Sequence, residues 1–180
     1  MSEQADPLNV ARELSVPRTA QQVWQFVCDM GNWAGQMPGY ISHEQLGPDD
    51  SVWTLQLNIG PFERPVAIDV HVLRWDEPHH VDFEIKGKHD PFVGSGKFHS
   101  VQEGDATRIV LAFRAEPTGS MARVLAPLMP PILNEVADQF SANLAKVLGR
   151  TTPAAAADQV PQRRGFWAWL IRKLLRRKSD

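Results

Sequence analysis

Residues 20–40, AQQVWQFVCDMGNWAGQMPGY, decide the fold class of this 180-residue chain. Thr19 precedes the stretch and Gln22 stands three residues later, a spacing typical of the capping box that starts a helix. The predicted helix has a broad apolar face, formed by Val23, Trp24, Phe26 and Val27. A second short helix or a series of turns follows, and Pro38-Gly39 closes it.

The sequence on either side of this helical stretch has the period of two that β-strands show. Before it, residues 9–17 place three apolar side chains on one face. After it, alternation continues from Tyr40 to Glu116, with turn clusters such as GPDD, DEPHH and QEGD between the runs. Such runs predict an antiparallel meander with one buried and one solvated face. The runs are residues 52–60, 64–75, 80–87 and 107–116, with a weaker one at 94–101 that Gly94 and Gly96 loosen.

The helical period returns after Pro117. A proline pair belongs at the start of a helix, so Pro130-Pro131 predicts a short helix at about 119–129 and a longer one at about 131–148. Gly149 stands where a helix C-cap is expected. The apolar stripe of the long helix is predicted to contain Ile132, Val136, Phe140, Leu144 and Val147.

This order of elements predicts an α+β fold of the helix-grip type, a curved antiparallel sheet of about seven strands around a long C-terminal helix. Over about residues 8–148 the chain resembles the START/Bet v 1-like (SRPBCC) superfamily. Members often have an apolar helix, then Asp, a Trp-containing second helix and a Pro-Gly before the second strand, as residues 20–40 do. Among the branches, the chain is most similar to the CoxG-like proteins of carbon monoxide dehydrogenase, in its Pro-Gly, its long final helix and its C-terminal extension.

The resemblance implies a cavity between sheet and helix for a lipid, sterol, quinone or polyketide. Periodicity alone favours the alternative, in which the same side chains form a close-packed core. If there is a cavity, the proline-broken segment from Met121 to Pro131 is a reasonable lid. The expected ligand-binding residues are Trp53, Leu55, Leu57, Ile68, Val70, Phe83, Phe98, Leu111, Phe113, Leu125, Leu128, Met129, Ile132 and Val136.

The pattern of reactive side chains does not favour catalysis. The six histidines lack zinc-ligand spacing, so no metal site is expected. We predict no catalytic residue, because no histidine or carboxylate clearly has inward parity; His71 or His99 in the cavity would favour an enzyme. The single cysteine, Cys28, lies in an apolar helical pattern and is interpreted as a small buried hydrophobe rather than a reactive thiol.

Charge divides the chain unevenly. The last twenty residues hold seven of the nineteen basic residues and one acid, so the preceding 160 hold twelve basic and twenty acidic residues. An acidic body argues against nucleic acid, and the basic tail points to an anionic partner. We therefore expect three parts: a ligand-binding domain at 1–149, a linker at 150–162 and a basic amphipathic helix at 163–180.

The tail sequence RRGFWAWLIRKLLRRK, residues 163–178, has the pattern of a membrane-surface helix. At about 100° per residue it presents an apolar arc of roughly 200° opposite a basic face. A groove on a partner protein, or packing against the body, are the alternatives. The expected membrane-binding residues are Phe166, Trp167, Trp169, Leu170, Ile171, Leu174, Leu175, Arg172, Lys173, Arg176 and Arg177.

These observations favour a non-enzymatic carrier of a hydrophobic ligand, cytoplasmic and peripheral on the inner face of the cell membrane. The polar start of the chain lacks a secretory signal. The CoxG-like resemblance implies menaquinone or ubiquinone as cargo and a molybdenum-containing carbon monoxide dehydrogenase, or a related oxidoreductase, as partner. Two alternatives remain: an enzyme like the polyketide cyclases and dehydratases, and a START-like adaptor.

Overall fold

The computed structural model describes residues 9–59 and 62–149. The chain divides into two units, Met1–Arg150 and Thr151–Asp180, and all described residues belong to the first. The predicted linker and the predicted tail helix therefore lie outside the described residues. The elements are β1 (Asn9–Val16), α1 (Ala20–Val27), α2 (Met30–Ala34), β2 (Tyr40–Gln45), β3 (Asp50–Ile59), β4 (Phe62–Asp76), β5 (His80–Gly87), β6 (Phe92–Glu103), β7 (Ala106–Pro117), the 3-10 turn η1 (Gly119–Met121), α3 (Ala122–Leu125), the 3-10 turn η2 (Ala126–Leu128) and α4 (Met129–Gly149).

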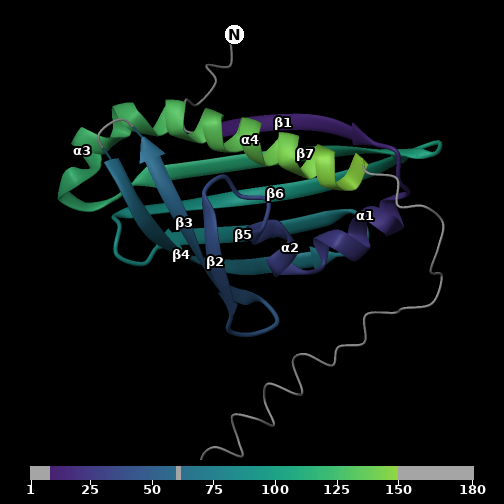
Figure 1. The fold of residues 1–180 in the computed structure, drawn as a ribbon, viewed down its shortest axis with the longest axis horizontal. Coiled ribbons are helices and arrows are strands. Elements are labelled where there is room, and N and C mark those ends of the chain that lie inside the picture. The colour runs from purple at the N-terminus through teal and green to yellow at the C-terminus, as the bar shows by residue number, and fades with distance from the viewer. Residues whose placement is uncertain (1–8, 60–61, 150–180) are drawn as a thin grey trace, which may run out of the picture. The chain divides into compact units, whose positions relative to one another are not determined.

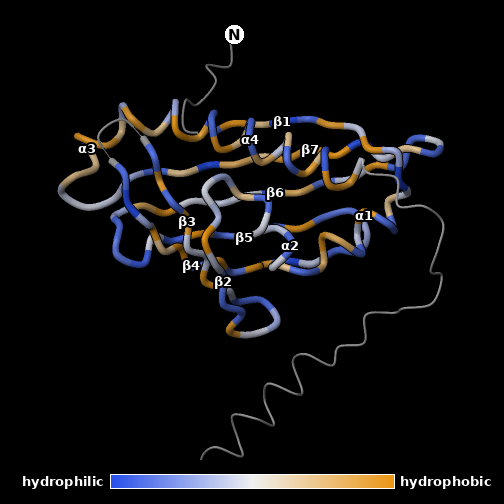
Figure 2. The backbone as a smooth tube through the Cα atoms, in the orientation of Figure 1, coloured by the Kyte–Doolittle hydropathy of each residue, from blue (hydrophilic) through white to orange (hydrophobic). Residues whose placement is uncertain are grey.

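The strands form one seven-stranded antiparallel sheet in the order β1-β7-β6-β5-β4-β3-β2 (Figure 1). The meander from β2 to β7 places each strand beside the next, and β1 pairs with β7. Apolar and polar residues alternate along the strands (Figure 2), as one buried face requires. With α4 packed against β1 and β7, this arrangement confirms the predicted helix-grip fold.

The helical stretch begins as its sequence predicts. The Thr19 hydroxyl accepts a hydrogen bond from the Gln22 amide at 3.2 Å, and the Gln22 side chain accepts one from the Thr19 amide at 2.9 Å. This reciprocal pair is the predicted capping box. Asp29 caps α2 in turn, because its carboxylate accepts a hydrogen bond from the Gly31 amide at 2.8 Å.

Cys28 is exposed, so the prediction that it is buried is wrong. It is the C-cap residue of α1, the position at which the helix ends. Its thiol lies 3.5 Å from the carbonyl oxygen of Gln25. The apolar face of α1 is instead completed by Val23, Trp24 and Val27, which are buried, while Phe26 is half-buried.

Trp33 of α2 joins the helices to the sheet. Its indole N–H donates to the carbonyl oxygen of Val27 at 2.5 Å. Its ring meets Phe83 and Phe98 edge-on, at centroid distances of 5.8 and 5.6 Å, and stacks on Phe140 of α4 at 6.1 Å. The buried core therefore centres on one aromatic residue that contacts two sheet strands and the long helix.

The segment between β7 and α4 differs from the prediction. The short helix expected at 119–129 is broken into η1, α3 and η2, because Pro127 has no amide hydrogen to continue a helix. The long helix begins at Met129, two residues earlier than expected, and Pro130-Pro131 lie in its first turn. No side chain of this broken segment is buried.

The apolar stripe of α4 matches the predicted one at two positions and differs from it by one residue at the other three. Phe140 and Leu144 are buried as expected, but Ile132, Val136 and Val147 are only half-buried. Both sets have helical spacing, and contact with β1 and β7 selects between them. The residues of α4 that are buried are Leu133, Ala137, Phe140, Leu144 and Leu148.

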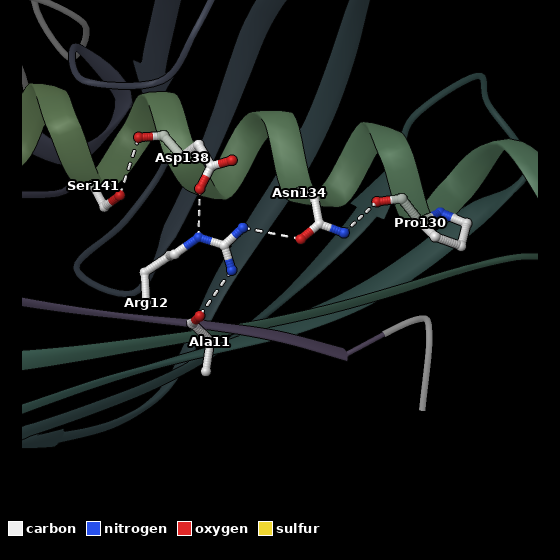
Figure 3. A network of polar contacts seen from close by, with 6 residues as sticks. All are labelled: Ala11, Arg12, Pro130, Asn134, Asp138 and Ser141. Carbon is white, nitrogen blue, oxygen red and sulfur yellow. Dashed lines mark hydrogen bonds and ion pairs between the residues drawn. The ribbon is translucent and has the colours of Figure 1, made fainter. Parts of the chain in front are cut away.

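An ionic network attaches α4 to the edge strand β1 (Figure 3). The guanidinium of Arg12 donates to the Asp138 carboxylate at 2.5 Å, to the Asn134 amide oxygen at 2.9 Å and to its neighbour's carbonyl, that of Ala11, at 2.9 Å. Asn134 also donates to the carbonyl oxygen of Pro130 at 2.9 Å, so the network reaches the first turn of α4. The N-terminal half of α4 is thereby held over β1.

Replacing Gly96 with Ala should destabilise the fold by about 1–3 kcal/mol, the usual cost of overpacking. A methyl group at Gly96 would overlap the ring of Phe83, which lies directly over the glycine. Urea unfolding measures the effect. Gly149→Ala is the control, because nothing lies within 4 Å of the methyl group it adds. Equal stability of the two variants would contradict this packing.

The Arg12–Asp138 pair should make stability depend on pH. The hydrogen bond from Arg12, and then its charge, lower the pKa of the Asp138 carboxyl below its ordinary value. A lowered folded-state pKa stabilises the fold above the ordinary pKa and stops doing so as the pH falls through the lowered one.

Asp138→Asn should therefore cost stability at neutral pH, and this cost should disappear in acid. Urea unfolding at several pH values measures the difference between the parent chain and the variant. Asp105→Asn, at an exposed turn residue, is the matched control. A difference that stays constant down to strongly acidic pH would exclude an ionic role for Asp138.

Candidate functional site

A cavity of about 70 Å³ lies between the inner face of the sheet and the helices α2 and α4. The sheet supplies its floor from β3 to β7, α2 and the turn after it supply one wall, and α4 supplies the roof. Ten of its twelve lining residues are apolar, so it suits an apolar guest. The lining consists of Trp33, Met37, Trp53, Ile68, Phe83, Ile85, Ser95, Phe113, Arg114, Leu133, Val136 and Phe140.

The two polar residues of the lining belong to neighbouring positions of the sheet. Ser95 and Arg114 pair across β6 and β7. Both are exposed, and Arg114 donates to the Glu116 carboxylate at 3.3 Å. Gly94, next to Ser95, has no side chain, and the carbonyl of Arg114 approaches it closely. The polar contribution to the cavity is therefore small beside that of the surrounding rings and aliphatic chains.

A second, smaller cavity of about 10 Å³ also borders Trp33. It shares Trp33, Trp53 and Phe83 with the first cavity. It has room for about one water molecule at most. We assign it to imperfect packing of the aromatic core, and the larger cavity is the candidate site. The rest of its lining is Met30, Val70, Val72, Trp75 and Val81.

The structure places five of the fourteen expected ligand-binding residues around the larger cavity: Trp53, Ile68, Phe83, Phe113 and Val136. Val70 lines only the smaller cavity. Phe98 and Leu111 are fully buried in the core, and Leu55 is buried beside it. Leu57, Leu125, Met129 and Ile132 are half-buried outside both linings, and Leu128 is exposed. Strand alternation alone cannot separate cavity-lining residues from core residues, because the side chains of both face inward.

Several lining residues were absent from the sequence-based set: Trp33, Met37, Ile85, Ser95, Arg114, Leu133 and Phe140. Trp33 could have been predicted, since the sequence of residues 20–40 already indicates a second helix that contains a tryptophan. Ile85 shares the inward parity of Phe83 on β5. Leu133 required the correct stripe of α4, which only contact with the sheet decides.

The histidines and carboxylates of the sheet lie outside this cavity. His71 is exposed and its Nδ1 lies 2.7 Å from the Asp50 carboxylate, which raises the pKa of His71. His99 lies on the outer face, with its ring 5.9 Å from that of His80. His80 pairs with Asp82 at 3.0 Å. Within residues 9–59 and 62–149, no group of His, Cys, Asp or Glu has a geometry that could hold a metal ion.

No helix among the described residues is long and apolar enough to span a membrane.

The roof of the cavity, α4, is held by side-chain hydrogen bonds in both halves, but the segment that leads into its N-terminal end is not capped. At its C-terminal end, α4 accepts a hydrogen bond from the Arg18 side chain at the carbonyl of Leu148, 2.5 Å away. Asn143 donates to the carbonyl of Gln36 at 2.9 Å, beside the cavity wall. Before Met129 the chain consists of single turns without side-chain caps. Any widening of the cavity is therefore easiest at the N-terminal end of α4.

A family model described as "Polyketide cyclase / dehydrase and lipid transport" matches residues 7–149, which include every lining residue of the cavity. No curated protein matches the chain.

Several solved structures have the same fold. A conserved protein from Geobacillus kaustophilus has a TM-score of 0.68 and 19% identity, over 78% of this chain and 95% of that one. A START superfamily protein from Mycobacterium smegmatis has a TM-score of 0.66 and 14% identity, over 80% and 99%. The Zhui aromatase/cyclase from a Streptomyces species has a TM-score of 0.57 and 15% identity, over 78% and 90%. The expected START/Bet v 1-like fold is thus confirmed.

Proposed function

The chain belongs to the polyketide cyclase/dehydrase and lipid-transport family, and we propose that it is a carrier that holds an apolar ligand between its sheet and α4. The observation that carries this proposal is the lining of the cavity, ten apolar residues of twelve. An aromatic and aliphatic surface of this kind stabilises a guest by removing apolar area from water. The mouth would lie at the N-terminal end of α4, where the chain is broken into single turns.

The same lining favours holding a ligand over converting it. General acid–base catalysis needs a titratable side chain within hydrogen-bond reach of the reacting atoms. The described residues offer His71 and His99 on the opposite face of the sheet, away from the cavity. A cyclase or dehydratase activity, as the name of the Streptomyces neighbour suggests for that protein, is therefore the second candidate.

The cavity must widen to hold its guest. At about 70 Å³ it is well below the roughly 300–1,000 Å³ of pockets for drug-sized ligands. Leu133 and Val136 of α4 close it from above. Outward movement of the first turns of α4 would enlarge it, and the missing amide hydrogen of Pro127 in the preceding turn lowers the cost of such a movement.

We further propose that the tail at 163–180 tethers the carrier to the inner face of the cell membrane. Basic residues near an anionic bilayer contribute about 1 kcal/mol each, and apolar side chains add to this as they enter the interface. A membrane-tethered carrier fits a respiratory quinone, menaquinone or ubiquinone, as cargo. Its receiving partner would then be an oxidoreductase of the carbon monoxide dehydrogenase type.

Organic extraction of the purified full-length chain should release an apolar compound that mass spectrometry detects. Val136→Phe should lower the amount bound by about tenfold, since an added ring in the cavity costs about 1–3 kcal/mol. Val110→Phe is the matched control, because Val110 is equally half-buried on β7 but lies outside the cavity.

Two results would contradict the carrier. One is a chain that releases nothing and takes up neither menaquinone nor phospholipid from vesicles. The other is equal loss of ligand in Val136→Phe and Val110→Phe. Release of an apolar compound that the chain converts to a new product would favour the enzyme.

Leu170→Glu with Leu174→Glu should move the chain from the pellet to the supernatant when it is sedimented with phosphatidylglycerol vesicles. Each substitution removes an apolar side chain worth about 1.5–3 kcal/mol at full burial, and less at an interface. Ligand extraction should be unchanged. Sedimentation equal to that of the parent chain would exclude the tail as a tether.

A further inference from the structure

The strongest unassigned feature is an apolar surface on the segment that joins β7 to α4. Three side chains of η1, α3 and η2 are exposed although apolar: Met121 at 48%, Val124 at 61% and Leu128 at 39%. They lie within eight residues of one another, on one segment of single turns. The other exposed large apolar residues are Tyr40 and Ile41 on the edge strand β2, Leu46 in the loop that follows it, and Leu73 on β4. Clustered exposed apolar residues mark a contact site more often than isolated ones do. We call Met121, Val124 and Leu128 the tip.

The charge around the tip is unusual for this acidic body. Residues 117–134 contain no acid, although the chain has twenty-one, and they contain one base, the exposed Arg123. This stretch is therefore neutral to basic and rich in proline and large apolar residues. Such a composition suits a surface that meets negative charge and hydrocarbon together.

The neighbouring hairpin adds further positive charge. The amide of Thr118 donates to the carbonyl of Pro91 at 2.6 Å, which brings the β5–β6 hairpin beside η1. This hairpin carries the exposed residues Lys88 and His89. Its acid, Asp90, is neutralised by an ion pair with Arg64 of β4, and the Asp90 side chain is only 12% exposed. The hairpin beside η1 thus brings the cation Lys88 near the tip, while its one acid, Asp90, is already paired.

The tip continues directly into the roof of the cavity. Leu128 is followed by Met129, which packs against the small cluster that contains Leu133. Leu133 in turn lines the cavity. Figure 1 places α3 at the end of the fold opposite α1, where α4 begins, and Figure 2 shows α3 itself as hydrophobic beside hydrophilic strand ends. A surface that contacted the tip would therefore lie beside the first turn of α4, which begins at Met129.

We propose that the tip is a second lipid contact, by which the body itself rests on the surface of an anionic phospholipid bilayer. Met121, Val124 and Leu128 enter the interface, while Arg123, Lys88 and His89 face the headgroups. The proposed tail anchors the chain to a membrane, whereas the tip orients the body so that the mouth of the cavity faces lipid. The orientation of the mouth rests on the proposed function, whereas the lipid contact of the tip is measured without any ligand.

A single fluorescent label can report this contact. In the full chain, Cys28→Ser removes the one native thiol, and serine can keep the hydrogen bond to the Gln25 carbonyl. Val124→Cys is then labelled with nitrobenzoxadiazole. Leu73→Cys is the matched control, because Leu73 is 58% exposed near the far end of β4. The probes are phosphatidylcholine vesicles with and without about one-third phosphatidylglycerol, an anionic lipid.

The label at position 124 should shift to the blue and brighten severalfold with the anionic vesicles, and the label at position 73 should not change. In the unlabelled chain, Val124→Glu should weaken partition by about tenfold, the value of one apolar side chain. Leu73→Glu should leave partition unchanged. Circular dichroism and urea unfolding confirm that each variant is folded.

Three results would overturn the proposal. The first is an unchanged label at position 124 while sedimentation shows the chain bound to vesicles, which leaves the tail as the one lipid contact. The second is a label that responds to rising protein concentration without vesicles, which makes the tip an interface between copies. The third is no binding to anionic vesicles at all. Ligand extraction, measured separately, can succeed or fail in each case, so failure of the tip is distinguishable from failure of the carrier.

Discussion

The rest of the structure depends on the contact between Trp33 of α2 and Phe140 of α4. Their rings stack at 6.1 Å, and Phe83 and Phe98 meet the same indole from the sheet. One side chain therefore sets the spacing between sheet and long helix at the middle of α4. Toward the N-terminal end of α4 the smaller side chains of Leu133 and other aliphatic residues fill less of that spacing, and the cavity lies there. The core and the candidate site therefore belong to the same layer of side chains between sheet and α4. Large aromatic rings fill this layer in the core, and smaller aliphatic side chains leave space at the site.

The two parts of this layer also differ in how firmly the chain above them is held. The C-terminal part of α4 is held by buried aliphatic residues and by the Arg18 side chain at its last turn. The first turns of α4 are held at one side, through Arg12 and Asp138, while the segment before them has no buried residue. Functional motion is drawn from the least stable parts of a fold. The segment with no buried residue is therefore the one that carries the exposed apolar tip.

Local signals in the sequence were reliable where the structure is local. Thr19 and Gln22 form the predicted capping box because its partners are three residues apart. Strand alternation identified the inward face of β3 to β7, because side-chain direction follows from the backbone alone. The predicted stripe of α4 is correct at Phe140 and Leu144 and wrong by one residue at its other three positions, and the prediction that Cys28 is buried is wrong because it is exposed. Both errors concern which of two compatible helix surfaces meets a distant strand.

The sequence by itself determined the order of the helices and strands, the hydrophobic periodicity of each, and the division of charge between an acidic body and a basic tail. These properties depend on residues that are close together along the chain. The tertiary structure decided which inward residues pack solidly and which surround a space. Phe98 of β6 and Phe113 of β7 have the same hydropathy, and both lie on the inward face of the sheet. Phe98 is nevertheless fully buried in the core, whereas Phe113 lines the cavity. Only their neighbours across the sheet and on α4 distinguish them, because packing depends on volumes that meet in space and not on sequence spacing.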